Sequence, residues 1–159
     1  MEGVSDEPRW LTPEQLAVWM KFSIVLVRMP QELDAQLQRE AGVSWFEYLV
    51  LAGLSEAPER TMRMSSLALL ANGSLSRLSH VVKRLEQRGW VVRRPCPEDG
   101  RYTNATLTDA GWDKVVATAP GHVDTVQRFF AEALEPQQLE QLDGVLDGLL
   151  GRLMPGECG

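Results

Sequence analysis

The segment from residue 74 to residue 88 restricts the fold most, because its apolar residues recur with the period of a helix. These residues are Leu75, Leu78, Val82 and Leu85, and their spacing is 3, 4 and 3 positions. This spacing predicts a helix with one buried face. Ser74 is suited to cap this helix and Gly89 to end it. A short apolar helix that Ser65 would cap, and an Asn72-Gly73 turn, come before it. Two helices joined by a glycine-containing turn predict a helix-turn-helix.

A β-hairpin is predicted directly after this helix. Trp90–Arg94 and Tyr102–Leu107 have the composition of strands, and the Pro- and Gly-containing segment 95–100 between them favours a turn. Residues 61–64 fit either a short strand or an extended link. Together with a helix that Ser44 would cap, these elements predict a winged helix-turn-helix lobe over residues 44–108.

Helical segments are predicted on both sides of this lobe. In residues 12–42, Thr12 to Gln15 has the pattern of a capping box, Pro30 is expected to kink or break the helix, and Gly42 ends it. In residues 109–153, Thr108 is suited to cap the first helix, and Pro120-Gly121 could interrupt it. The last helix carries an apolar stripe, consisting of Leu139, Leu142, Val145, Leu146, Leu149, Leu150 and Leu153.

These elements predict a mainly α fold with a small β-hairpin wing, in the α+β class. Residues 1–11 are expected to form an N-terminal arm and residues 154–159 a flexible tail. Gly144 and Gly148 lie four positions apart in the last helix, where each glycine is unfavourable. A closely approaching partner helix would explain them.

The charge of the chain is unevenly distributed. The net charge is −6, yet the segment from Arg60 to Arg101 holds nine basic and three acidic residues, a net of +6, and the rest of the chain carries −12. A basic segment in an acidic protein is typical of a DNA-binding module, although a solvated basic face without a ligand has the same composition.

The sequence offers little for other classes of function. No apolar run approaches the roughly 18 residues of a membrane span, and no signal peptide is recognisable, so we expect a cytoplasmic protein that does not bind membranes. Cys96 and Cys158 lie outside any CxxC pattern, and the only histidines are His80 and His122, so neither a metal site nor a cofactor is expected. No nucleophile or phosphate-loop motif is present, and we expect no enzyme activity.

The second helix of the helix-turn-helix is expected to read DNA in the major groove. Small polar residues near its start allow close approach, and longer donors follow. We expect Arg77 to contact a guanine, and Lys83 and Arg84 to contact phosphates. The candidate DNA-binding residues of this helix are Ser74, Ser76, Arg77, Ser79, His80, Lys83 and Arg84.

Arginines flank the tip of the hairpin. Arg93, Arg94 and Arg101 are further DNA-binding candidates, because arginine is favoured in a narrow minor groove. Asp99 would be repelled by phosphates, so we expect it to pair with a nearby arginine and support the wing.

Residues 75–94 and the segment Asp99-Gly-Arg101 followed by Leu107-Thr-Asp-Ala-Gly111 resemble the MarR (multiple antibiotic resistance regulator) family of winged-helix regulators. The resemblance extends over about residues 11–153. It implies a homodimer in which residues 12–42 and 109–153 form a helical dimerisation region. It also implies binding to a pseudo-palindromic double-stranded DNA site, with Arg101 in the minor groove, and transcriptional control, commonly repression.

The family resemblance further implies a small aromatic or lipophilic effector, bound between the dimerisation helices and the DNA-binding lobe. Trp19, Phe22, Trp45 and Phe46 are the candidate pocket walls, although aromatic residues at helical spacing also suit a core or a dimer interface. Cys96 lies in the wing among arginines, where a lowered thiol pKa is conceivable. The alternative function is a winged helix that binds proteins and has no specific DNA site.

Overall fold

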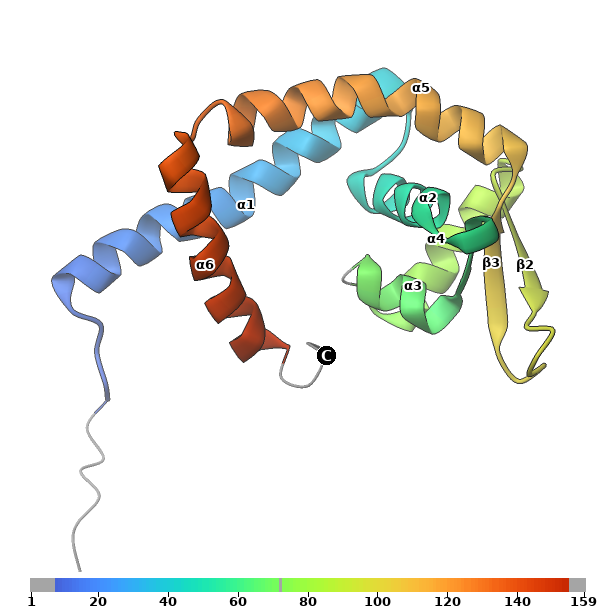
Figure 1. Cartoon of the computed structure of the whole chain (residues 1–159), viewed down its shortest axis with the longest axis horizontal. Coiled ribbons are helices and arrows are strands. Elements are labelled where there is room, and N and C mark those ends of the chain that lie inside the picture. The colour runs from blue at the N-terminus through green and yellow to red at the C-terminus, as the bar shows by residue number, and fades with distance from the viewer. Residues whose placement is uncertain (1–7, 72, 155–159) are drawn as a thin grey trace, which may run out of the picture.

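The protein consists of a long helical arch and a lobe attached near one end of it (Figure 1). The computed structural model describes residues 8–71 and 73–154, so Asn72, residues 1–7 of the expected arm and residues 155–159 of the expected tail lie outside it. Helices α1 and α5 run side by side along the arch. The elements are α1 (Pro13–Ala41), α2 (Trp45–Glu56), η1 (Pro58–Arg60), β1 (Thr61–Arg63), α3 (Met64–Leu70), α4 (Leu75–Gln87), β2 (Val91–Pro95), β3 (Thr103–Leu107), α5 (Asp109–Val126), η2 (Gln127–Ala131) and α6 (Pro136–Leu153).

One apolar core holds the lobe together. It joins residues of α2, α3, α4 and α5 to the inner face of the sheet, and its fully buried members include Val50, Leu51, Leu54, Leu67, Leu78, Val82, Leu85, Val91 and Ala105. A smaller cluster, formed by Leu37 of α1 with Val43 and Tyr48, attaches the lobe to the arch. The position of the lobe therefore depends on the C-terminal part of α1.

The sheet has three antiparallel strands in the order β1-β3-β2. Strands β2 and β3 form the expected hairpin, with Val91 opposite Leu107. Strand β1 resolves the open alternative for residues 61–64, because Thr61–Arg63 pairs along β3. The Thr61 and Thr106 hydroxyl oxygens lie 2.8 Å apart across this pair. Strand β1, which leads directly into α3, thereby attaches the wing to the helix-turn-helix.

Neither internal proline breaks its helix. Helix α1 continues through Pro30 and α5 through Pro120, so the open possibility of an interruption at Pro120-Gly121 is resolved in favour of a continuous helix. A proline removes one hydrogen bond, and packing on both sides can outweigh that local cost. At Gly121 the two helices come so close that a Cβ atom would overlap the Glu40 carboxylate of α1. Helix α5 ends at Val126 and continues as the short π-helix η2.

Most helix starts agree with the sequence. The hydroxyls of Thr12, Ser44, Ser74 and Thr108 each accept a backbone N–H of the first turn. The expected cap at Ser65 is wrong, because α3 begins at Met64 with Arg63 in the cap position. Strand β1 runs directly into α3 and leaves no free residue for a side-chain cap.

Gly111, which follows the wing in the first turn of α5, lies in very close contact with other parts of the lobe. A Cβ atom here would overlap the Trp90 carbonyl oxygen and lie 2.6 Å from Leu107 Cδ1. The Thr108 hydroxyl donates to the Gly89 carbonyl at 2.7 Å. The first turn of α5 is therefore pressed against the link between α4 and β2, and only glycine allows this approach.

We expect the Gly111→Ala variant to be less stable by about 1–3 kcal/mol, because an added methyl group must push back a backbone carbonyl. Thermal and urea unfolding at one fixed protein concentration would measure the loss. Gly100→Ala is the control, since a Cβ atom there meets no neighbouring atom within 4 Å. Equal stability of the two variants would contradict the steric explanation.

Candidate DNA interface

Helix α4 has a buried side and a polar side. Leu78, Val81, Val82 and Leu85 face the core. Ser76, His80 and Lys83 lie on the opposite, exposed side. The sequence placed Leu75 on the buried face, and this is wrong, because Leu75 is 55% exposed. It lies in the first turn of α4, beside the seven-residue helix α3, and the core does not reach it.

The flank of α4 that faces α2 carries two of the candidate arginines. The guanidinium of Arg77 lies over the Phe46 ring, 4.2 Å from its centroid. Arg84 Nε donates to the buried Glu47 carboxylate at 3.1 Å, and its side chain remains 56% exposed. The same carboxylate also accepts the Ser44 backbone N–H at 2.8 Å. Helix α2 therefore fixes the positions of the Arg77 and Arg84 side chains on the surface.

The flank of α4 that faces the wing contains an ion pair, here called the Glu86–Arg93 clamp. The Glu86 carboxylate accepts the Arg93 backbone N–H at 2.9 Å, Nε at 3.0 Å and Nη2 at 2.7 Å. The remaining Nη1 donates to the Ser79 hydroxyl at 3.3 Å. Arg93 and Ser79, both DNA-binding candidates, are thus engaged within the protein, where they join the wing to α4.

The Arg93 side chain lowers the pKa of Glu86 through these hydrogen bonds, so the clamp stabilises the charged carboxylate. Its contribution is complete above the ordinary carboxyl pKa of 4.5 and is lost as the pH falls through the lowered value in the folded protein. We expect Glu86→Gln to lower the free energy of unfolding by about 1 kcal/mol at pH 7, after allowance for solvent screening. The difference from wild type should shrink at pH 3–4.

Urea unfolding at both pH values, at one protein concentration, measures this difference. Glu56→Gln, which neutralises an exposed carboxylate at the end of α2, is the matched control. A Glu86→Gln difference that is the same at both pH values would exclude a pH-dependent clamp.

The tip of the wing places Arg101 in the solvent. Its side chain is 84% exposed, and its Nη2 lies 2.7 Å from the Asp99 carboxylate. Asp99 also accepts the Arg101 backbone N–H at 3.1 Å. The Arg101 side chain lowers the pKa of Asp99, and Asp99 raises the pKa of Arg101. Asp99 therefore holds the turn and the arginine together, with the guanidinium pointing away from the core. Arg94 is also exposed, on β2.

Cys96 lies beneath the same turn and is buried, with 6% of its surface exposed. The backbone N–H groups of Asp99 and Glu98 lower the pKa of its thiol, and the charge of Arg63 adds to the effect. Cys158 lies outside the described residues.

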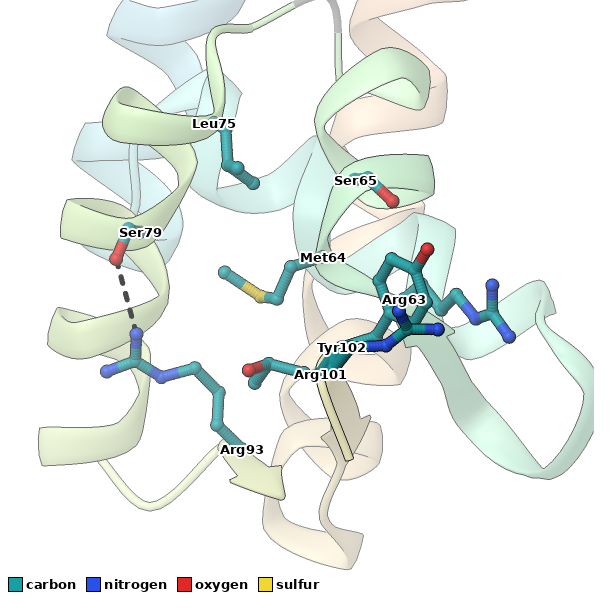
Figure 2. A pocket seen from close by; sticks show the side chains of 9 residues that line it. Arg63, Met64, Ser65, Leu75, Ser79, Arg93, Arg101 and Tyr102 are labelled. Carbon is teal, nitrogen blue, oxygen red and sulfur yellow. Dashed lines mark hydrogen bonds between the residues drawn. The ribbon is translucent and has the colours of Figure 1, made fainter. Parts of the chain in front are cut away.

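A groove of about 280 Å³ opens between α4, α3 and the wing (Figure 2). Six of its nine lining residues were not site candidates in the sequence, namely Arg63, Met64, Ser65, Leu75, Tyr102 and Thr103. The Arg63 guanidinium lies 4.7 Å from the centre of the Tyr102 ring and thereby joins the start of α3 to the wing. Arg63 belongs to the basic segment, so its charge was the one feature of the sequence that could have marked it as a candidate. Its place beside the wing depends on the pairing of β1 with β3, which the sequence does not show.

A second cleft, of about 500 Å³, lies between α1, α2 and the start of α4, and its walls include Pro30, Trp45, Phe46, Leu49 and Arg77. Two of the four candidate pocket walls, Trp45 and Phe46, line it. Trp19 and Phe22 do not, because they lie at least eight residues, or roughly 12 Å, before Pro30 along the same helix. Their rings pair with each other at 6.2 Å.

Within residues 8–71 and 73–154, no group of three or more potential metal-binding side chains comes together. No helix of this part is long and apolar enough to span a membrane. A helix-turn-helix, a three-stranded wing and an exposed basic surface together define a winged helix-turn-helix protein of the DNA-binding class. Residues 43–103 match the family model described as the MarR family.

Two solved structures from Streptomyces coelicolor are similar over nearly the whole chain. Sco3205, a MarR family transcriptional regulator in complex with DNA, is 43% identical with a TM-score of 0.91, and 96% of each chain is covered. AbsC, another MarR family transcriptional regulator, is 36% identical with a TM-score of 0.88, covering 92% of this chain and 98% of its own. The chain therefore belongs to the MarR family of transcriptional regulators, as its wing segment predicted.

A curated relative gives the same classification. The uncharacterized HTH-type transcriptional regulator YkoM of Bacillus subtilis is 31% identical over 105 residues, which cover 65% of this chain and 66% of YkoM. The chain thus spans slightly less than two thirds of that relative. These proteins are regulators of transcription and not enzymes, in agreement with the sequence analysis.

Proposed function

We propose that this regulator binds a pseudo-palindromic DNA operator as a homodimer and represses transcription there, until a small aromatic or lipophilic molecule releases it. The observation that carries the DNA-binding part is the common exposure of Ser76, His80 and Lys83 on α4 with Arg94 and Arg101 on the wing. Helix α4 thereby offers donors to a major groove, and the wing offers donors to the adjacent minor groove.

The contacts divide between base reading and positioning. Arg77, held over Phe46, is the proposed guanine contact. Lys83 and Arg84 would contact phosphates, which fix the register of the protein and make its affinity depend on salt. Ser74 caps α4 with its hydroxyl, and Arg93 is used by the clamp. These two DNA-binding candidates therefore support the reading surface from within the protein and are not among the proposed DNA contacts.

The exposed apolar surface of the arch supports a homodimer. Helix α6 contains no buried residue, and its Leu139, Leu150 and Leu153 are 45%, 46% and 77% exposed. Val18, Trp19 and Ile24 of α1 are exposed by more than half. Such a surface is unstable in water unless it is covered. A second copy would cover it by an isologous contact and would present two lobes to a palindromic site.

The cleft beside Pro30, Trp45 and Phe46 is the proposed effector site. Its volume suits a small molecule, and Arg77 at its edge belongs to the DNA-reading helix. A panel of planar aromatic compounds should contain members that release the protein from its operator. Leu49→Trp, which fills the cleft, should keep operator affinity and lose this response. A response that persists in Leu49→Trp would place the effector elsewhere.

Selection of bound fragments from a random duplex pool by the purified protein tests the DNA-binding function. We expect an enriched palindrome whose half-sites are separated by about one helical turn, roughly 10 base pairs. The logarithm of affinity should fall steeply with the logarithm of salt concentration. No enriched sequence and no salt dependence would favour the alternative, a winged helix that binds proteins.

A further inference from the structure

Leu75 is a large apolar side chain on the surface proposed to meet DNA. It is the first residue of α4 and is 55% exposed, between the polar residues Ser74 and Ser76. Figure 2 shows its side chain projecting from α4 into the groove between α4 and α3. The core is completed without it by Leu78, Val81, Val82 and Leu85. Leu75 therefore has an exposed face that packing within the chain does not explain.

The groove around Leu75 combines one apolar part with a polar surround. Met64, which is 8% exposed and belongs to the core, lines it together with Leu75. The other lining residues are polar, charged or amphipathic, namely Arg63, Ser65, Ser79, Arg93, Arg101, Tyr102 and Thr103. The long side chains Arg63 and Arg93 are already held by Tyr102 and by Glu86. The apolar part thus lies near the start of α4, on the surface that carries Ser76.

The chemistry of DNA limits what this apolar part can meet. Base edges in the major groove present hydrogen-bond donors and acceptors, and the only apolar group among them is the 5-methyl group of thymine. In helix-turn-helix proteins the N-terminal residues of the second helix are those that approach base edges. The sugar–phosphate backbone also has apolar atoms, but these are the same at every base pair.

We propose that Leu75 contacts the 5-methyl group of a thymine in the operator and is a specificity-determining residue. Ser76 and Arg77 supply hydrogen bonds beside it, and Leu75 supplies the recognition of a methyl group that hydrogen-bonding residues cannot provide. The inference rests on the proposed DNA-binding function, because it requires α4 to lie in a major groove.

Replacing thymine by uracil tests the contact, because it removes one methyl group and leaves base pairing unchanged. An operator is first selected with the wild-type protein, and duplexes are then made with uracil at each thymine in turn. At one position in each half-site, we expect the wild-type affinity to fall about fourfold, the factor for returning one methyl group to water. Leu75→Ala should bind the thymine duplex more weakly and should not distinguish it from the uracil duplex.

Leu69→Ala is the matched control, because Leu69 is 58% exposed on α3 and does not line the groove. It should retain the full response to uracil. The proposal is overturned if no thymine position responds in the wild type, or if Leu75→Ala keeps the same response. Equal loss of affinity of Leu75→Ala for every duplex, with the uracil response intact, would show a backbone contact instead. Failure of the wild type to select any sequence would contradict DNA binding itself, which is a separate result.

Discussion

Replacing Arg101 with glutamate is expected to lower operator affinity about 100-fold or more, because an exposed cation at the wing tip becomes an anion beside phosphates. Arg101 is the most solvent-exposed arginine among the ion pairs of the wing, with 84% of its side chain accessible. The change leaves the core untouched, because the Arg101 side chain is exposed and its ion pair with Asp99 lies at the wing tip. Fluorescence anisotropy with the selected operator at several salt concentrations measures the loss.

A graded series separates the wing contact from a general effect of charge. Arg101→Gln should weaken binding by about tenfold and reduce the salt slope by about one, as expected for one lost cation. Arg128→Glu makes the same charge change at an Arg–Asp pair of 3.3 Å on the far end of the arch, and should bind almost as well as wild type. If Arg101→Glu bound the operator as tightly as wild type, the wing would have no role in DNA binding.

Replacing Leu149 with aspartate is expected to dissociate the proposed dimer. Leu149 lies in the apolar stripe of α6, a helix with no buried residue in the single chain. A second copy covering this stripe would bury two new carboxylates, one from each subunit. An unpaired buried charge costs about 3–5 kcal/mol, so we expect the dimer dissociation constant to rise at least 100-fold. Sedimentation velocity over a dilution series measures this change.

Gln141→Asp is the control, because it adds the same side chain to the exposed, polar side of α6. It should remain dimeric. Operator affinity should fall with dimerisation in Leu149→Asp, because a monomer contacts one half-site only. A Leu149→Asp variant that stays dimeric at nanomolar concentration would move the interface away from this stripe.

The clamp and the wing tip use the same pairing of charges for different purposes. Glu86 withdraws Arg93 from the solvent and joins β2 to α4. Asp99 leaves Arg101 exposed and fixes only its direction. In the sequence, Arg93 and Arg101 looked like equivalent DNA contacts, because arginines next to a basic helix have the same local pattern. Their partners lie seven and two residues away, and only the hairpin geometry decides which one is enclosed.

The amino-acid sequence by itself determined the features that depend on neighbours along the chain. The apolar period of α4 from Leu78 to Leu85, the hydroxyl caps of four helices and the turn between β2 and β3 arise within a few residues, and the structure contains each of them. The segment from Asp99 to Gly111 was specific enough to indicate the family. Gly111 is needed there because the first turn of α5 touches the Trp90 carbonyl.

The tertiary structure alone decided which side chains are free to act. It paired β1 with β3, exposed Leu75, enclosed Arg93, and separated Trp19 and Phe22 from the cleft that Trp45 and Phe46 line. The physical reason is that exposure depends on which distant segment packs against a residue, and sequence periodicity describes only one helix or strand at a time. Leu75 continues the apolar period of α4, but the helix that would have covered it is seven residues long and leaves it exposed.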